Sequence, residues 1–426
     1  TSISLYTGLT KPSLRKEIFL EKTVIVATPQ TIESDLKNNR ISLQDFSLLV
    51  IDEAHRSRMK YANTLVAKNY IENAKNPRIL ALTASPGHTK EKINEICSNL
   101  FIENVEIRTE EDEDVMPYMQ KKSIEFVNVD LTEDLKKMQD LLKSLYNDKI
   151  QNLKKIGFTK PAYLVSKKDL LMLQQQFQRE ISKGNPSAFF AISLIAQLLK
   201  ISHLTGLVET QGPVQAKNFI TKLKSEKTKA SKIISNSNAF IETEAIIDNL
   251  ISKNILHPKM DSLKYIIKEQ FKNSQNSRVI IFANYRDTIE EIIKSIKEIE
   301  NCHPIKLIGH KEGITQKQQM ETIKGLESGI YNCIVTTSIG EEGLSIGSLD
   351  LCILFDNVPS AIRRIQREGR VARIKPGRII YLITKNTMDA AYYWKSKRDE
   401  KTMKKTIDNI KNKLDEQQNQ KNFIKK

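Results

Sequence analysis

The sequence predicts two α/β domains with parallel sheets, the first of them incomplete, and an all-helical insertion between them. Three observations lead to this prediction. The 426 residues are about three times the ~150 residues expected of one domain. Short apolar runs alternate with helical patterns in both outer parts of the chain, which is typical of parallel sheets covered on both faces. Helical patterns alone fill the stretch between these parts.

The first α/β domain is expected over residues 1–130. Its apolar and β-branched runs predict strands, and the segments between them have the spacing of helices. The expected strands lie at 23–27, 47–51 and 78–82, and the expected helices at 31–37, 61–73 and 89–100.

The helical insertion is expected over residues 131–257. Apolar residues there recur at the i, i+3 and i+4 positions of a helix, and Ser166 with Asp169 has the pattern of a helix cap. The expected helices lie at 133–155, 166–181, 187–203, 214–225 and 229–253. His257 and Pro258 end the insertion, because proline stops a preceding helix.

The second α/β domain is expected over residues 258–390. Its strands are expected at 278–282, 304–308, 333–336, 351–355 and 378–383, with helices between them. Residues 391–426 are expected to form a charged helix that runs into a frayed tail from residue 415.

Charge indicates a polyanionic partner, with nucleic acid first. The chain has 67 Lys and Arg against 51 Asp and Glu, a formal charge of +16. Residues 1–130 carry 17 basic and 19 acidic residues, 131–260 carry 20 and 11, and 261–426 carry 30 and 21. The basic excess therefore belongs to the insertion and the second α/β domain. A solvated lysine-rich surface is the alternative explanation.

Several other classes of protein are not indicated. No apolar run approaches the ~18 residues that span a bilayer, since the one at 188–199 is short and interrupted. No signal peptide is visible. The four cysteines have no CxxC spacing, which argues against a disulfide framework and a zinc site. We expect an intracellular, cytoplasmic protein associated with the nucleoid, with no membrane partner.

The sharpest motif is Asp52-Glu53-Ala54-His55 directly after an apolar run. Parallel sheets present ligands at the carboxyl ends of their strands. In a nucleotide hydrolase, one carboxylate there holds Mg²⁺ through water and the next activates the attacking water. His55 could couple this site to another domain. An ordinary strand end with a capping aspartate is the alternative for Asp-Glu alone.

Two further motifs support a phosphate-handling protein. Thr83 and Ser85 follow another expected strand and could hydrogen-bond the carboxylates of its neighbour, although a Ser-Pro-Gly turn is the simpler explanation. Five arginines fall within residues 363–373, and guanidinium groups match phosphate oxygens. On a helix, Arg370 and Arg373 would share one side. A basic helix that binds nucleic acid is the alternative.

Hydroxyl and glycine residues also follow two expected strands. Thr336, Thr337 and Gly340 follow one of them, and Thr28 and Pro29 follow another. Backbone N–H groups and hydroxyls at a helix start suit a phosphodiester backbone.

Together and in this order, these motifs resemble a superfamily 2 helicase, specifically the archaeal Hef helicases and the eukaryotic Fanconi anaemia M-type translocases. The resemblance runs from about residue 5 to about residue 400. The motifs that carry it are Thr7-Gly8, ATPQT (27–31), IDEAHR (51–56), LTASPG (82–87), VIIFANYR (279–286), TTSIGEEGL (336–344) and IQREGRVAR (365–373). Dicer-like and innate-sensor RNA helicases share the inserted helices, so an RNA helicase remains an alternative.

The resemblance implies two RecA-like domains and roles for named residues. It implies ATP and Mg²⁺ as cofactors and branched or fork-like DNA as the partner, with RNA as the alternative. Implied catalytic residues are Asp52 (also the Mg²⁺ contact), Glu53, His55, Gln366, Arg367, Arg370 and Arg373, with the last two as arginine fingers. Implied coupling residues are Thr83 and Ser85. Implied ATP contacts are Gly343 and Ser345. Implied nucleic-acid contacts are Thr7, Gly8, Thr28, Pro29, Thr336 and Thr337.

Three departures from the family pattern matter. Ser345 stands where the family usually has Asp, and Ala372 replaces a usual Gly, which a helix should tolerate. No Gly-Lys pair occurs in the chain, whereas a phosphate-binding loop needs GxxxxGK[ST]. We therefore expect an N-terminally truncated helicase fragment that binds ATP poorly and does not hydrolyse it. A remnant that binds nucleic acid without catalysis is the alternative.

Overall fold

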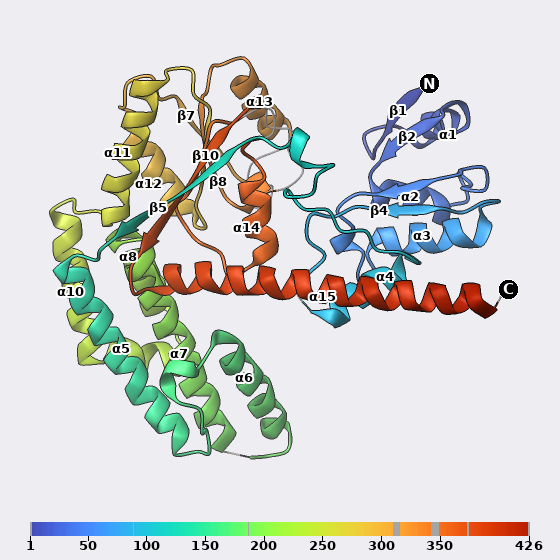
Figure 1. Ribbon diagram of the computed structural model, residues 1–426. Coiled ribbons are helices and arrows are strands. Elements are labelled where there is room, and N and C mark those ends of the chain that lie inside the picture. The colour runs from blue at the N-terminus through green and yellow to red at the C-terminus, as the bar shows by residue number, and fades with distance from the viewer. Residues whose placement is uncertain are drawn as a thin grey trace. The chain divides into compact units, whose positions relative to one another are not determined.

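The structure is a computed structural model that describes residues 2–87, 89–185, 187–309, 316–341, 349–372 and 375–424 (Figure 1). The chain divides into two compact units. One consists of Thr1–Met119, Ser360–Gln366 and Lys395–Lys426, and the other of Gln120–Pro359 and Arg367–Trp394. Each unit is described by itself below.

The first unit contains two short parallel sheets. One pairs β1 (Ile3–Tyr6) with β2 (Val24–Ala27), and the other pairs β3 (Leu49–Ile51) with β4 (Ile79–Ala81). Its helices are α1 (Pro12–Glu21), α2 (Pro29–Lys37), α3 (Ala62–Asn73) and α4 (Lys90–Asn99), with 3-10 turns at Ala54–Arg56 and Met116–Tyr118. The three strands and three helices expected here are confirmed; β1 and α1 were not anticipated.

One face of these short sheets is apolar and exposed. Exposed and more buried residues alternate along β1 and β2, as they do along any strand. The exposed apolar side chains in the four strands are Ile3, Leu5, Val24, Val26, Val50 and Leu80. The opposite face packs on a core that includes Tyr6, Phe19 and Tyr70.

The insertion is all-helical, as expected. Its helices are α5 (Glu133–Lys154), α6 (Lys167–Ser182), α7 (Ser187–Thr210), α8 (Pro213–Ser225), α9 (Lys229–Ser235) and α10 (Asn238–Ser252), with a 3-10 turn at Ala162–Leu164. Ser166 and Asp169 form the expected capping box. The single helix expected over 229–253 is wrong, because the chain breaks between α9 and α10, where Asn236 and Ser237 follow one another.

Helix α7 corrects the expectation about apolar runs. Its 24 residues are long and apolar enough to cross a membrane by length and composition, and half of its most apolar window is buried inside the protein. It packs against α5, α6 and α8. A helix that is apolar on all sides is expected in the centre of a bundle as well as in a membrane.

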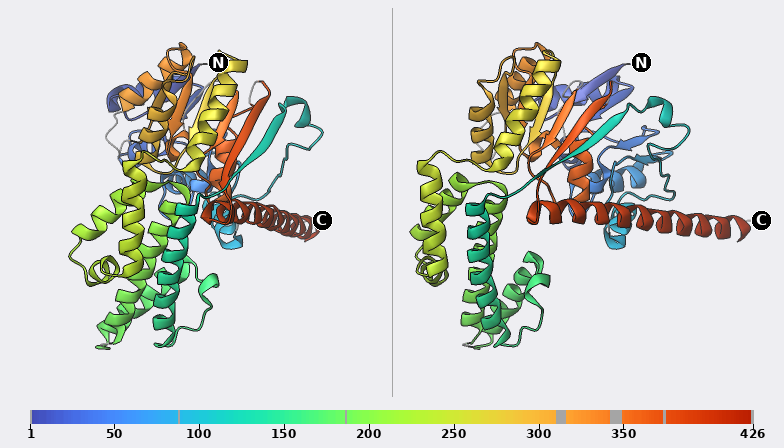
Figure 2. Two further views of the ribbon diagram at one scale, coloured as in Figure 1. Left: turned by 90° about the vertical axis from the view of Figure 1, so that its left-hand side faces the viewer. Right: turned by 60° about the vertical axis from the view of Figure 1, so that its left-hand side comes forward.

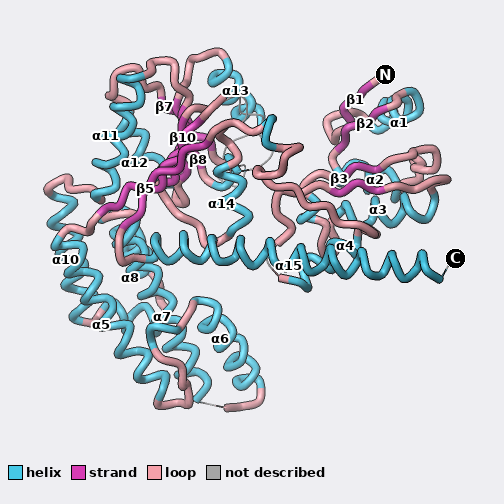
Figure 3. Tube along the Cα trace, viewed as in Figure 1, coloured by secondary structure: helices cyan, strands magenta, loops and turns pink. Residues whose placement is uncertain are grey.

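The second unit is built on a six-stranded parallel sheet with the order β5-β10-β9-β6-β8-β7 (Figures 1 and 3). The strands are β5 (Lys122–Val129), β6 (Val279–Phe282), β7 (Pro304–Leu307), β8 (Cys333–Thr336), β9 (Leu351–Leu354) and β10 (Gly377–Thr384). Its helices are α11 (Pro258–Asn273), α12 (Arg286–Ile296) and α13 (Gln316–Glu327), with a 3-10 turn at Ser338–Glu341. Helix α14 (Ala361–Glu368) begins in the segment Ser360–Gln366 of the first unit and ends in the second. The five strands expected here are confirmed.

Two boundaries differ from the sequence-based ones. The first α/β domain was expected to span residues 1–130 and so to include β5. However, β5 pairs along its whole length with β10 and therefore belongs to the six-stranded sheet. The expected tail from residue 415 is wrong, because α15 (Met388–Ile424) continues through it as one helix. Within the second unit, the helical insertion extends from one end of the six-stranded sheet (Figure 2).

Candidate functional site

The acidic pair lies at the carboxyl end of β3. Asp52 is exposed and Glu53 is half-buried. The parallel register places Ile51 opposite Ala81, so residues 52–53 and 82–83 leave the sheet at the same edge. Two backbone bonds hold these segments together, from Leu82 N–H to Ile51 O at 2.8 Å and from Ala54 N–H to Leu82 O at 2.9 Å. Glu53 has φ 50°, a left-handed conformation that costs a non-glycine residue about 1–2 kcal/mol.

His55 joins the acidic pair to the next strand. Its Nδ1 lies 3.2 Å from Glu53 Oε2 and 3.2 Å from Thr83 Oγ1. Ser85, which is buried, donates its backbone N–H to Thr83 Oγ1 at 3.2 Å. Burial lowers the pKa of His55 from its ordinary value although Glu53 opposes this. The structure therefore brings the expected catalytic and coupling residues of this unit into one cluster.

The donor set of this cluster suits Mg²⁺ held together with a nucleotide. Carboxylate oxygens are the ligands that Mg²⁺ prefers, and it usually takes one or two of them alongside substrate phosphates and water. No group of three or more His, Cys, Asp or Glu that could hold a metal by itself occurs within the described ranges. Asp52 and Glu53 fit the role of partial ligands.

The first unit also brings two nucleic-acid candidates together. Tyr6 pairs with Ala27 in the parallel ladder, so Thr7-Gly8 and Thr28-Pro29 emerge side by side. Thr28 donates its N–H to Tyr6 O at 3.3 Å. Thr28 and Gly8 are exposed, and a Cβ at Gly8 would meet no atom within 4 Å. This edge can receive a phosphate against backbone and hydroxyl groups.

In the second unit, Thr336 lies inside the domain. It is fully buried, and its hydroxyl donates to Leu307 O on β7 at 2.8 Å. Gly340 packs so closely on it that a Cβ there would lie 2.5 Å from Thr336 Cγ2. Thr337 is 8% exposed. The hydroxyl of Thr336 is thus used within the sheet, unlike the surface contact that the resemblance implies.

The arginine motif differs in shape from the helix that was expected. Helix α14 ends at Glu368, so it carries Gln366 and Arg367 but not Arg370. Ala372 has φ 60°, which is left-handed and explains why the family usually has glycine there; the expectation of a helix at this position is wrong. Arg373, Gly343 and Ser345 lie outside the described residues.

Arg367 is 1% exposed and uses all three guanidinium nitrogens within its own unit. Nε bonds Glu341 Oε1 at 2.7 Å, one terminal nitrogen bonds Asp356 O at 2.8 Å, and the other bonds Asn284 Oδ1 at 3.0 Å. Arg370, 6% exposed, donates to Glu341 O. The three acceptor residues were given no role from the sequence, although Asn284 and Glu341 lie in motifs that carry the resemblance. Asn284 and Asp356 follow apolar strands, the same signal that identified Asp52.

Three family models match successive parts of the chain. They are described as type III restriction enzyme, res subunit (residues 6–88), putative ATP-dependent RNA helicase, helical bundle (134–253), and helicase conserved C-terminal domain (258–375).

Relatives match nearly the whole chain. A Methanocaldococcus jannaschii protein named as a candidate ATP-dependent RNA helicase is 35% identical over 95% of this chain and 51% of its own length. The Schizosaccharomyces pombe ATP-dependent DNA helicase fml1 is 32% identical over 89% of this chain and 48% of its own length. The chain thus spans about half the length of these relatives.

A solved structure supports the same assignment. The Pyrococcus furiosus Hef helicase domain is 40% identical, with a TM-score of 0.70, over 92% of this chain and 82% of that one. On this evidence the chain belongs to the Hef and Fanconi anaemia M-type family of superfamily 2 helicases.

Proposed function

We propose that the protein is an ATP-dependent DNA helicase or translocase that acts on branched DNA in repair or replication-fork processing. The observation that carries this proposal is the cluster of Asp52, Glu53, His55 and Thr83 at one sheet edge, in a chain of this helicase family. The names of relatives from S. pombe and Neurospora crassa, ATP-dependent DNA helicases, support DNA as the substrate.

Each part of the cluster has a proposed task. Asp52 would hold Mg²⁺ through water, and the ion would supply charge neutralisation at the phosphates. Glu53 would orient and deprotonate the attacking water. His55 would transmit changes at the carboxylates to Thr83 through its hydrogen bond, and through Thr83 to Ser85. Arg370 and Arg373 would face the γ-phosphate, while Thr7, Gly8, Thr28, Pro29 and Thr337 would contact the nucleic-acid backbone.

The insertion would clamp duplex DNA through its basic surface. Its segment 131–260 carries an excess of nine positive charges. Lys222 and Lys227 are exposed, whereas Lys224 pairs with Glu244. Replacing Lys222 and Lys227 with Glu should weaken fork binding severalfold and flatten its salt dependence. If the affinity for forked DNA is unchanged at two salt concentrations, these lysines are not part of the interface.

The phosphate-binding loop is proposed to lie outside residues 1–426 in the natural protein. Support comes from the absence of a Gly-Lys pair and from the exposed apolar face of β1–β4, which a further segment could cover. We propose that residues 1–426 alone do not turn over ATP.

The test is ATP turnover by the natural full-length protein with and without forked DNA. Glu53→Gln should lower DNA-stimulated turnover by about 10²–10⁴-fold, the contribution of a general base. Glu72→Gln is the matched control, because Glu72 is an exposed carboxylate on α3 whose contact, with Lys68, is a surface pair. Activity that survives Glu53→Gln would contradict the proposal.

An RNA helicase is the second candidate, favoured by the names of the M. jannaschii relative and of the helical-bundle family. The same assay with duplex RNA in place of forked DNA separates the two. Binding of either nucleic acid without turnover by the wild-type full-length protein would instead favour a non-catalytic binding protein.

A further inference from the structure

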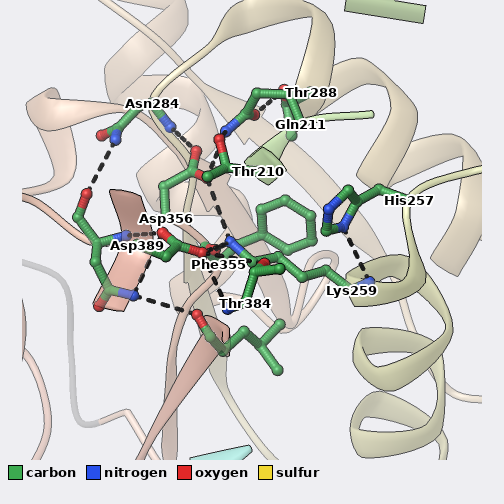
Figure 4. Close-up of polar contacts among 12 residues, drawn as sticks. Thr210, Gln211, His257, Lys259, Asn284, Thr288, Phe355, Asp356, Thr384 and Asp389 are labelled. Atoms are coloured by element: carbon green, nitrogen blue, oxygen red, sulfur yellow. Dashed lines mark hydrogen bonds and ion pairs between the residues drawn. The ribbon is translucent and has the colours of Figure 1, made fainter. Parts of the chain in front are cut away.

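A buried polar network joins the insertion to the six-stranded sheet of the second unit (Figure 4). Gln211, 2% exposed, lies in the short link between α7 and α8. Its Nε2 donates to Asp356 Oδ1 at 2.7 Å, and its Oε1 accepts from the Thr288 hydroxyl at 2.6 Å. One side chain of the insertion thus bonds both the segment after β9 and the first turn of α12.

The link that carries Gln211 packs closely against the start of α11. Gly212 has φ 108°, a conformation that glycine adopts without cost. A Cβ there would lie 2.9 Å from His257 Cβ, below van der Waals contact. The corner between α7 and α8 therefore packs against His257 at the start of α11, and the bonds to Asp356 and Thr288 orient the Gln211 side chain.

Asp356 needs the bond from Gln211. It is 2% exposed, and its Oδ2 accepts from Asn284 N–H at 2.6 Å. Lys259 Nζ lies 3.9 Å from Oδ1, but this ammonium pairs closely with Asp389 and donates to Phe355 O at 2.8 Å. Two buried carboxylates thus share one cation. Since a buried charge is costly unless it is hydrogen-bonded, the amide of Gln211 is an important donor to Asp356.

Asp356, which accepts from Gln211, also holds Arg367, together with Asn284. The backbone carbonyl of Asp356 and the side-chain oxygen of Asn284 accept from the two terminal nitrogens of Arg367. Asn284 is bound in turn through its N–H to the Asp356 carboxylate. A displacement of Asp356 therefore reaches Arg367 through two contacts.

We propose that Gln211 is a positioning residue through which the helical insertion sets the orientation of Arg367 and of the arginine segment that follows it. The consequence for turnover rests on the proposed helicase function. Nucleic acid that shifts the α7–α8 corner would act on the arginine motif through this amide, so the insertion would regulate catalysis as well as bind substrate.

The first test is amide hydrogen exchange in residues 1–426. Gln211→Met keeps the volume and removes the bonds to Asp356 and Thr288, together with the local bond from Nε2 to Thr210 Oγ1. It should speed exchange at least tenfold at Arg370 and Val371, whose N–H groups bond Arg367 O and Glu368 O, and leave α7 and α8 unchanged. The matched control is Gln215→Met, because Gln215 is also buried and bonds α12, through Glu291 at 3.0 Å, with no bond to Asp356.

Thr288→Val is a second variant. It removes the bond from Thr288 to Gln211 Oε1 and leaves the bond from Gln211 to Asp356 in place. It should give a smaller effect at the same two amides. The proposal is overturned if exchange at Arg370 and Val371 is unchanged in the folded variants, or if Gln215→Met speeds it equally.

The second test is turnover by the full-length protein. Gln211→Met should lower the DNA-stimulated kcat at least tenfold with little change in the KM for ATP or in DNA affinity. Unchanged kcat in an active protein overturns the inference. If the wild type shows no DNA-stimulated turnover, the proposed function fails, while the exchange experiment still decides whether Gln211 positions Arg367.

Discussion

The two α/β regions, which are the short sheets β1–β4 of the first unit and the six-stranded sheet of the second, have strands of similar sequence. The side chains of these strands differ in how far they are buried. VIVA in β2 and LVI in β3 are as apolar as VIIF in β6 and LCIL in β9. Every residue of β6, β8 and β9 is buried, whereas Val26 and Val50 are 55% and 51% exposed. An uninterrupted apolar strand predicts cover on both faces. The described residues supply that cover in the second region and on only one face of the first.

The largest effect is expected from the buried charges. Lys259→Met leaves Asp389 without its cation, and breaking a buried pair costs about 3–5 kcal/mol. In the first region, Arg40 is 38% exposed and shares Asp35 with Arg15, so Arg40→Met should cost about 1 kcal/mol or less. Urea unfolding followed by the single tryptophan, Trp394, measures the loss in the second unit, and hydrogen exchange in β1–β4 measures the loss in the first. Equal losses would contradict the distinction between the two regions.

Strand truncations give the next effect. Ile280→Ala on β6 removes a fully buried side chain and should lower the free energy of unfolding by about 3 kcal/mol. Val26→Ala on β2 should change it by about 0.5 kcal/mol or less, as at an exposed position. The first unit's unfolding can be followed by hydrogen exchange in β1–β4. A large cost at Val26 would show that its face is covered in solution.

The smallest effect concerns pH. Burial lowers the pKa of His257 from 6.5 to about 3, while Nδ1 accepts from Lys259 N–H and Nε2 donates to Glu209 O. Below pH 6.5 the unfolded chain binds a proton that the folded chain excludes, so stability falls as the pH drops from 6.5 towards 3. The loss is about 2 kcal/mol at pH 5. His257→Asn should remove this part of the pH dependence, as measured by urea unfolding at pH 7 and pH 5. If the free energy of unfolding falls as much between pH 7 and pH 5 in the variant as in the wild type, other groups cause the loss.

Most elements and one half of the site could be predicted from the sequence. The strands before Asp52 and Thr83 are short apolar runs, and adjacent parallel strands bring their carboxyl ends together. Contacts between distant segments could not be predicted. The pairing of β5 with β10 joins residues about 250 positions apart, and the burial of Arg367 depends on three separate segments. The left-handed Ala372 was missed because spacing alone does not report backbone dihedrals.

ATP turnover by residues 1–426 with forked DNA is the most direct test of the proposal that the phosphate-binding loop lies outside these residues. The full-length protein under the same conditions is the positive control, and circular dichroism confirms that the shorter chain is folded. We predict no DNA-stimulated turnover by residues 1–426 and clear turnover by the full-length protein. DNA-stimulated turnover by residues 1–426 that disappears with Glu53→Gln would contradict the account.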